Sequence, residues 1–361
     1  MKLAFETALL QKVNDVCLAF AGSTIDDANK YLTIQTCKNK VYMYVSDGFG
    51  IFSLVRTTNV EFQDLVMRIE LSVFKDIARN CQDKLVQIDL DNDSAKIESG
   101  SRTFVAPAFK DNSKPITFDQ FMDTSSGIEA SELSKLIDNA SFVASYGYEN
   151  ADIIMFKRQS SIVCLGNGNG LSYFEMKGEF DENTVVTFPY TTSRHFFKAL
   201  EFIPKDAKLQ LYSFQGNTLF AGSSYLFMFP RIPDERYRGI VELSGEYISL
   251  VKDTPVATLD YSSLKDTAAM LSKFENNHRT QTMLRFDKYG FLNFDSVADK
   301  TVKVSDRMKV ENLPANFQPA KVNCRSLNSF LARTRKSKIG LAMTKYGPLF
   351  TTLSRDFAII A

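Results

Sequence analysis

The sequence predicts an α+β protein of three tandem domains, each a doubled unit of one strand, one helix and about three further strands. Two observations support this class. A strand–helix pattern recurs six times along the 361 residues at spacings of 59 to 71 residues, and polar or proline-containing stretches follow the second and fourth copies. Because one unit alone cannot cover its helix and both faces of its sheet, we expect the units to fold in pairs.

Each copy opens on an apolar residue of a short strand and continues into an amphipathic helix. The fifth and eighth residues after that opening are apolar in five of the six copies, and this spacing places them on one helical stripe. The copies open at Phe5, Ile69, Ile128, Phe188, Leu259 and Val322. The fifth positions are Leu10, Phe74, Leu133, Ser193, Leu264 and Leu327, and the eighth are Val13, Ile77, Leu136, Phe196, Thr267 and Phe330. Predicted helix N-caps are Ser72, Ser131, Thr191 and Ser262.

Strand-like sequence follows the helices. Short apolar runs separated by Gly, Asn or Asp are typical of antiparallel hairpins. The predicted strands are Leu85–Leu90, Ala95–Glu98, Thr103–Ala106, Lys208–Phe214, Thr218–Ala221, Tyr225–Phe229, Ile339–Met343, Leu349–Leu353 and Phe357–Ile360.

Two polar, proline-containing stretches are interpreted as linkers between pairs of units. They are Lys110–Thr117 and Pro230–Gly239. The predicted domains are therefore residues 1–112, 118–232 and 240–361.

Composition narrows the class of protein. The chain is 44% hydrophobic with a net charge of +1, which argues against a uniformly basic nucleic-acid binder but permits a basic patch on one surface. Its five cysteines are widely spaced and form no C-x-x-C pair, so we expect a reducing compartment, the cytoplasm of a bacterium or of an infected host cell. No apolar stretch is long enough to span a membrane, so we expect no membrane partner.

Three local stretches carry a family resemblance: residues 1–16 (MKLAFETALLQKVNDV), Leu209–Ile240 and Phe357–Ala361. Together with the three doubled units they resemble the bacterial DNA sliding clamp, the beta subunit of DNA polymerase III, over essentially the whole chain. The linker from Ile232 to Arg238 is two residues longer than the family's, and the short Met-Pro-rich tail of cellular clamps is lacking. Such divergence suits a bacteriophage-encoded member.

The resemblance implies a DNA polymerase processivity factor without enzymatic activity or cofactor. Two chains would pair head to tail as a homodimer and close a ring around double-stranded DNA, with helices inside and sheets outside. The implied partners are the replicative DNA polymerase and a clamp loader.

Basic residues cluster on the helical face opposite the apolar stripe, and in the clamp fold this face lines the central hole. Lys and Arg there would meet phosphates without reading sequence. A solvated face of mixed charge is the alternative, because Asp15, Asp76, Asp138 and Asp266 share it. The predicted DNA-facing residues are Lys12, Lys75, Arg79, Lys135, Arg194, Lys198, Lys265, Lys273, Arg325 and Arg333.

The resemblance also implies a pocket for short, partly hydrophobic partner peptides. The stretch Gly166–Leu171 matches the family's pocket lip only at Gly168 and Leu171. Residues 166–170 also invite a phosphate-loop interpretation, but no helix or Lys-Ser/Thr follows them, and a tight hairpin turn is favoured. The predicted pocket residues are Gly168, Leu171, Pro233, Arg238, Ile240, Ile359 and Ile360.

No catalytic or metal-binding motif is found. The two histidines, His195 and His278, are far apart, and no Walker, zinc-protease or serine-hydrolase signature occurs. The competing class is a structural or interaction protein, for example a phage virion component built from repeated β-rich domains and without a DNA role.

Overall fold

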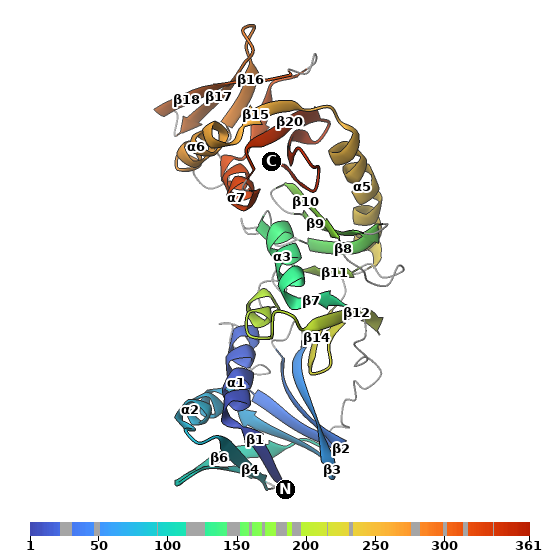
Figure 1. Ribbon diagram of the computed structural model, residues 1–361, viewed down its shortest axis with the longest axis vertical. Coiled ribbons are helices and arrows are strands. Elements are labelled where there is room, and N and C mark those ends of the chain that lie inside the picture. The colour runs from blue at the N-terminus through green and yellow to red at the C-terminus, as the bar shows by residue number, and fades with distance from the viewer. Residues whose placement is uncertain are drawn as a thin grey trace. The chain divides into compact units, whose positions relative to one another are not determined.

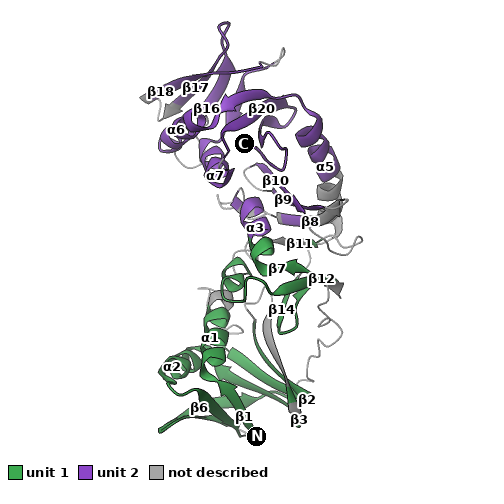
Figure 2. Cartoon of the chain, in the orientation of Figure 1, with its two compact units in different colours: residues 1–134, 179–231 green, residues 135–178, 232–361 purple. Residues whose placement is uncertain are grey.

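The computed structural model describes residues 1–21, 31–46, 51–91, 93–112, 127–142, 152–158, 161–167, 170–177, 186–189, 196–214, 216–230, 234–275, 282–298, 302–312, 317–334 and 336–361. The chain divides into two compact units, residues 1–134 with 179–231 and residues 135–178 with 232–361 (Figure 2). Helix α3 (Ala130–Ser141) begins in unit 1 and continues into unit 2. The three domain boundaries expected from the sequence remain a prediction.

Unit 1 is built on an antiparallel sheet whose strands run β1-β4-β5-β6-β3-β14-β13-β12-β7, with β2 paired to β3 (Figure 1). Strand β3 is 20 residues long and pairs with β14 near its start, at Leu54 and Tyr225, and with β6 near its end, at Ile69 and Ala108. A helical turn lies at residues 196–200. The elements are β1 (Lys2–Glu6), α1 (Thr7–Ala21), β2 (Tyr31–Ser46), β3 (Ile51–Glu70), α2 (Leu71–Asn80), β4 (Leu85–Leu90), β5 (Ser94–Ser99), β6 (Arg102–Lys110), β7 (Ile128–Glu129), β11 (Val186–Pro189), β12 (Lys208–Phe214), β13 (Asn217–Ala221) and β14 (Tyr225–Pro230).

Unit 2 holds two antiparallel sheets. The strands of one run β8-β9-β10-β22-β21-β20-β15, and those of the other run β18-β17-β16-β19. The elements are β8 (Asp152–Arg158), β9 (Ser161–Asn167), β10 (Leu171–Lys177), α5 (Asp234–Asp253), β15 (Ala257–Asp260), α6 (Tyr261–Ser272), β16 (Thr282–Phe286), β17 (Phe291–Ala298), β18 (Val302–Lys309), β19 (Ala320–Val322), α7 (Cys324–Thr334), β20 (Lys338–Thr344), β21 (Gly347–Thr352) and β22 (Phe357–Ile360).

The predicted fold class is confirmed: strand–helix–meander units recur along the chain, and the strands pair antiparallel. The predicted apolar stripe is also confirmed. Every described residue at the fifth and eighth positions, from Leu10 and Val13 to Leu327 and Phe330, is buried. Strands β4, β12 and β22 have the predicted bounds. The stripe therefore fixes each helix on its sheet and leaves the opposite face free for function.

The predicted N-caps are wrong at the three described positions. Helix α2 starts at Leu71, α3 at Ala130 and α6 at Tyr261, so the serines lie inside the first turns. The cap of α6 is Asp260, whose side chain accepts a hydrogen bond from the Ser263 amide at 2.8 Å. The leading strands run directly into the helices, and this moves each start earlier than the sequence suggests.

The second predicted linker, Pro230–Gly239, differs from the structure because α5 begins inside it. The helix runs from Asp234 to Asp253. Buried residues then recur at the helical spacing of Ser244, Tyr247, Ile248 and Val251. The segment is therefore helical up to Asp253, two residues before Pro255.

Candidate nucleic-acid interface and docking surface

The basic residues predicted to face DNA lie on the helix surfaces beside the buried stripe. Arg79, Lys135, Lys198, Lys265 and Lys273 are exposed, and Lys12 and Lys75 are half-buried. Arg194 lies outside the described residues. Each unit thus has exposed cationic side chains on its described helices, and their contact with DNA remains a prediction.

Three of these lysines lie over aromatic rings of their own unit. The ammonium groups of Lys12, Lys135 and Lys265 lie 5.9, 5.8 and 5.7 Å from ring centroids, those of Tyr225, Phe174 and Tyr261 respectively. Such cation–π contacts are weak where they are exposed, and they leave the ammonium able to meet a phosphate.

Arg325 is engaged in contacts within the protein. Its guanidinium donates to the backbone carbonyls of Ser272 and Glu275, and its amide donates to the Glu275 carboxylate at 3.2 Å. That carboxylate also accepts from the Cys324 amide at 2.9 Å, so Glu275 caps the start of α7. Burial raises the pKa of Glu275, although the Cys324 and Arg325 amides oppose this rise. Arg325 therefore connects the start of α7 to the segment that ends α6 and follows it.

Arg333 joins α7 to α3. Its Nη2 donates to Asp138 Oδ1 at 2.9 Å and its Nη1 to the Ser329 carbonyl at 3.1 Å, while the guanidinium lies 5.2 Å from the Phe142 ring centroid. This ion pair engages Asp138, one of the acidic residues that share the helical face with the predicted DNA-facing residues. Sequence reasoning missed both arginine contacts because Asp138 and Glu275 are 195 and 50 residues away from their partners.

Two of the predicted DNA-facing residues, Lys135 and Arg333, line the same cleft of about 990 Å³ in unit 2. Lys177 and Lys336 add positive charge, and Asp138 and Asp356 add negative charge. The cleft is therefore a mixed-charge surface with an excess of basic groups.

Three of the predicted partner-pocket residues, Leu171, Ile359 and Ile360, can be placed in the structure. Leu171 and Ile360 are direct partners on β10 and β22 and share one face of the sheet. Ile359 is buried, and strand alternation places it on the opposite face. Gly168 and Pro233 lie outside the described residues; Arg238 and Ile240 lie in α5, where their side chains are not described. The pairing of Leu171 with Asn167 confirms the hairpin predicted at this stretch.

Helix α5 covers the face that carries Leu171 and Ile360. One buried cluster joins Tyr247, Ile248 and Val251 of α5 to residues of β9, β10, β20, β21 and β22. The Tyr247 hydroxyl donates to the Leu171 carbonyl at 2.7 Å. The surface expected to be open is therefore occupied by a segment of the same chain.

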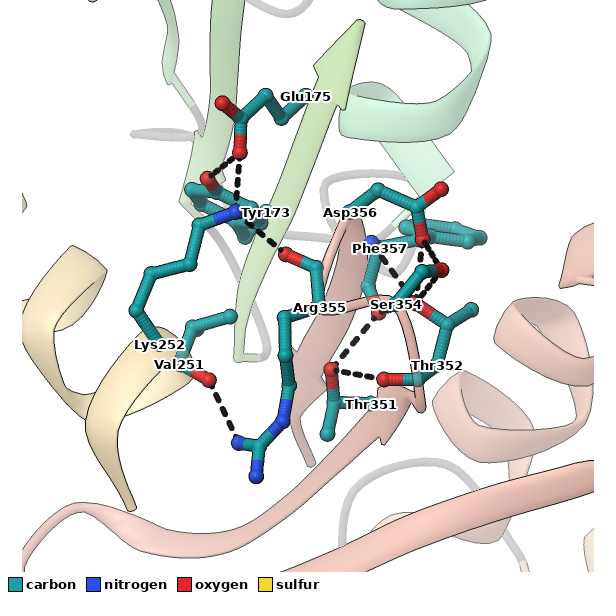
Figure 3. A network of polar contacts seen from close by, with 10 residues as sticks. All are labelled: Tyr173, Glu175, Val251, Lys252, Thr351, Thr352, Ser354, Arg355, Asp356 and Phe357. Carbon is teal, nitrogen blue, oxygen red and sulfur yellow. Dashed lines mark hydrogen bonds and ion pairs between the residues drawn. The ribbon is translucent and has the colours of Figure 1, made fainter.

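A polar network fastens the C-terminal end of α5, as Figure 3 shows. Lys252 forms an ion pair with Glu175 of β10 and donates to the Arg355 carbonyl at 3.0 Å. Arg355, in the turn between β21 and β22, has a positive φ of 59°. Its guanidinium donates to the Val251 and Thr254 carbonyls at 2.7 and 2.8 Å, which satisfies acceptors at the end of the helix.

The Glu175 carboxylate is held in its charged form. Its burial raises the pKa, but hydrogen bonds from Lys252 and from the Tyr173 hydroxyl at 2.5 Å outweigh this, so the pKa of Glu175 lies below its ordinary value. The spacing of Ser244, Tyr247, Ile248 and Val251 was the sequence signal that could have revealed α5. Nothing in the sequence indicates Glu175 or Arg355 as its partners.

Metal-ligand groups and cysteine reactivity can be assessed for the described residues. They contain no group of three or more His, Cys, Asp or Glu residues that could hold a metal ion. Burial raises the pKa of the Cys17, Cys164 and Cys324 thiols, so these cysteines are poor nucleophiles. Among the described residues, no helix combines the length and apolar character needed to cross a membrane.

Comparison with known proteins gives a consistent result at the level of fold. No protein-family model matches the sequence, and no curated protein matches it. A putative DNA polymerase III beta subunit from Eubacterium rectale is similar in structure, with a TM-score of 0.79 and 14% identity over 100% of this chain and 98% of that chain. The DNA polymerase III subunit beta from Pseudomonas aeruginosa has a TM-score of 0.75 and 12% identity over 99% and 98%.

A third similar structure is the beta sliding clamp of Caulobacter crescentus, described with PEG bound to a putative beta-motif tethering region. Its TM-score is 0.73, with 13% identity over 100% of this chain and 98% of that chain. Agreement over the full length of each protein, at such low identity, establishes the architecture. The chain has the fold of the DNA polymerase III beta sliding clamps.

Proposed function

We propose that the protein is a DNA polymerase processivity factor without enzymatic activity: a closed ring that encircles duplex DNA and slides without sequence specificity. The observation that carries this proposal is the match to sliding clamps over nearly all of both chains. A match to part of a clamp would be compatible with a different assembly. A match over nearly the whole chain means that this chain has a counterpart for each structural unit of a clamp subunit.

The basic helix surfaces support the DNA role. Lys and Arg side chains that meet phosphates bind through charge and counterion release, which carries no base information. Lys75, Arg79 and Lys198 lie on such surfaces of unit 1, and Lys265 and Lys273 on those of unit 2. Contacts of this kind exchange easily between phosphates, as sliding requires.

The ring would be a head-to-tail homodimer of three-domain subunits with domains at 1–112, 118–232 and 240–361. A head-to-tail contact is heterologous and closes only when the rotation between subunits is correct. Strand β18 ends its sheet, and β2 pairs only with β3 among the described strands. Both strands thus offer an edge that a second subunit could cover.

The polymerase and the clamp loader would dock by short, partly hydrophobic segments. The surface proposed for them centres on Leu171 and Ile360, with Gly168, Pro233, Arg238, Ile240 and Ile359 as further predicted contributors. We place the protein in the cytoplasm of a bacterium or of an infected host cell.

The decisive experiment measures topological linkage to DNA. The chain has a mass of 40.7 kDa, so its particle in solution should have about twice that mass. When loaded on nicked circular DNA by its loader, the protein should stay bound at moderate salt and leave when the circle is cut once. A monomer in solution, or equal retention on circular and linear DNA, would contradict the proposal that the protein forms a closed ring. That outcome would favour a structural protein built from repeats.

A further inference from the structure

The apolar sheet face under α5, called the groove below, is formed by strands of unit 2. Its floor is the sheet face with Val163 and Leu165 of β9, Tyr173 of β10, and Ala358 and Ile360 of β22. The helix enters it with Tyr247, Ile248 and Val251, which are 2%, 5% and 0% exposed. Residues at positions i, i+1 and i+4 thus anchor α5, as in complexes where an amphipathic helix lies in an apolar groove.

The contacts that fasten α5 are reversible. They are the ion pair of Lys252 with Glu175, the bonds from Arg355 to the last carbonyls, and the bond from Tyr247 to the Leu171 carbonyl. Each polar group would find water when the helix leaves. The strands β9, β10, β22 and β21 under α5 are held to one another by backbone pairing that does not involve α5.

The helix is also weak in itself. Gly245 lies exposed in the middle of α5, where a Cβ would meet no atom within 4 Å, so no packing contact requires a glycine there. Glycine inside a helix favours the unfolded segment because its backbone loses more freedom on folding. The placement of α5 therefore depends on the groove more than on its own helical propensity.

We infer that α5 is an internal cover of the partner-docking groove, which a partner segment with an aromatic residue and branched aliphatic residues at the same spacing displaces. This inference rests on the proposed function for the identity of the surface, since Leu171 and Ile360 are residues of the predicted pocket. In the closed state the chain occupies its own groove. In the open state the partner's segment takes the positions of Tyr247, Ile248 and Val251.

The test uses α5 itself as the probe, supplied in trans. A labelled synthetic peptide of residues 240–256 is titrated into the full-length protein and into the variant Tyr247→Ala/Ile248→Ala/Val251→Ala. Tethered α5 has an effective concentration on the order of millimolar, so it excludes a micromolar peptide from the wild-type groove. The variant keeps the floor but lacks the anchors, and it should bind the peptide at least roughly tenfold more tightly than wild type. A peptide carrying the same three alanines should bind neither protein.

A second measurement does not depend on the folding of that variant. Hydrogen exchange of residues 244–253 is compared with that of β9 and β10 in wild type, Arg355→Ala and Gly245→Ala. Arg355→Ala should speed exchange in α5 alone. Gly245→Ala should slow it about two- to fivefold, which corresponds to the usual preference of helices for alanine over glycine.

The outcomes separate the inference from the proposed function. Failure of the peptide to bind the variant, or exchange of α5 only together with the strands in all three proteins, would show that α5 is a permanent part of the core. Neither assay uses DNA or a polymerase, so that result would leave retention on circular DNA untouched. Conversely, if the variant binds the peptide but the protein forms no ring, the clamp function would be contradicted and the inference that α5 covers a binding groove would stand.

Discussion

In unit 2, strand β9 passes so close to the end of helix α3 that only glycine fits at residue 166. At Gly166, an added Cβ would lie 1.9 Å from the Ala140 carbonyl oxygen and 2.6 Å from Ser172 Oγ. The Ser172 hydroxyl donates to that carbonyl at 2.7 Å, which satisfies an acceptor at the end of α3. The hairpin signal in the sequence predicted the turn here, but not the helix end lying against the strand.

Replacing Gly166 with alanine should destabilise the protein. The Cβ collides with backbone atoms, so a strand or helix must shift, at a cost of about 1–3 kcal/mol. Thermal or urea unfolding of Gly166→Ala measures the loss. The matched control is Gly245→Ala, which should stabilise by about 0.5–1 kcal/mol because the site is open and helical. Equal stability of both variants would show that β9 and α3 do not touch at this point.

At the scale of elements, the apolar periodicity of the sequence predicted the helices and strands of the repeated units, in which each helix packs on a sheet. The stripe at Leu10, Phe74, Leu133, Leu264 and Leu327 is buried because apolar spacing determines which helix face meets a sheet. Helix α5 was missed because Pro230 and Pro233 lie just before it, because its charged residues resemble those of a linker, and because Gly245 interrupts its pattern. Its docking depends on Glu175 and Arg355, which are 77 and 104 residues from their contacts in the helix.

The attachment of α5 should weaken at acid pH. The folded pKa of Glu175 is lowered from its ordinary value of 4.5, so the charged carboxylate contributes stability that is present above pH 4.5. This contribution is lost as the pH falls through the lowered folded pKa. Glu175→Gln should therefore cost about 1 kcal/mol or less at pH 7, and the cost should vanish in acid. Unfolding midpoints of wild type and variant between pH 3 and 7 test this prediction.

A double-mutant comparison tests whether Lys252 is the group that lowers the pKa of Glu175. In a Lys252→Met background the difference between Glu175 and Gln should shrink, since the cation that holds the carboxylate charged is gone. A pH dependence that survives unchanged in this background would assign the lowered pKa to another group. The ion pair would then not be what fastens α5.

At the scale of the whole molecule, strand pairing joins segments that the sequence assigned to different domains. In unit 1, β14 pairs with β3, and in unit 2, β10 pairs with β22. Periodicity detects each repeated unit because the same apolar spacing recurs, but it contains no signal for which strand edges meet. The repeated units could therefore be predicted from the sequence, whereas the joining of their sheets required the structure.

Charge on the helix surfaces should control retention on DNA. The triple variant Lys75→Glu/Arg79→Glu/Lys198→Glu should leave circular DNA at lower salt than wild type and show a shallower salt dependence, by about one unit of slope per lost phosphate contact. The control Lys96→Glu/Lys110→Glu/Lys288→Glu makes the same change in net charge at exposed residues of strands and a turn. It should be retained like wild type. If both variants lose DNA equally, net charge alone governs binding and the helices have no special role; if neither does, the basic helix surfaces do not meet DNA.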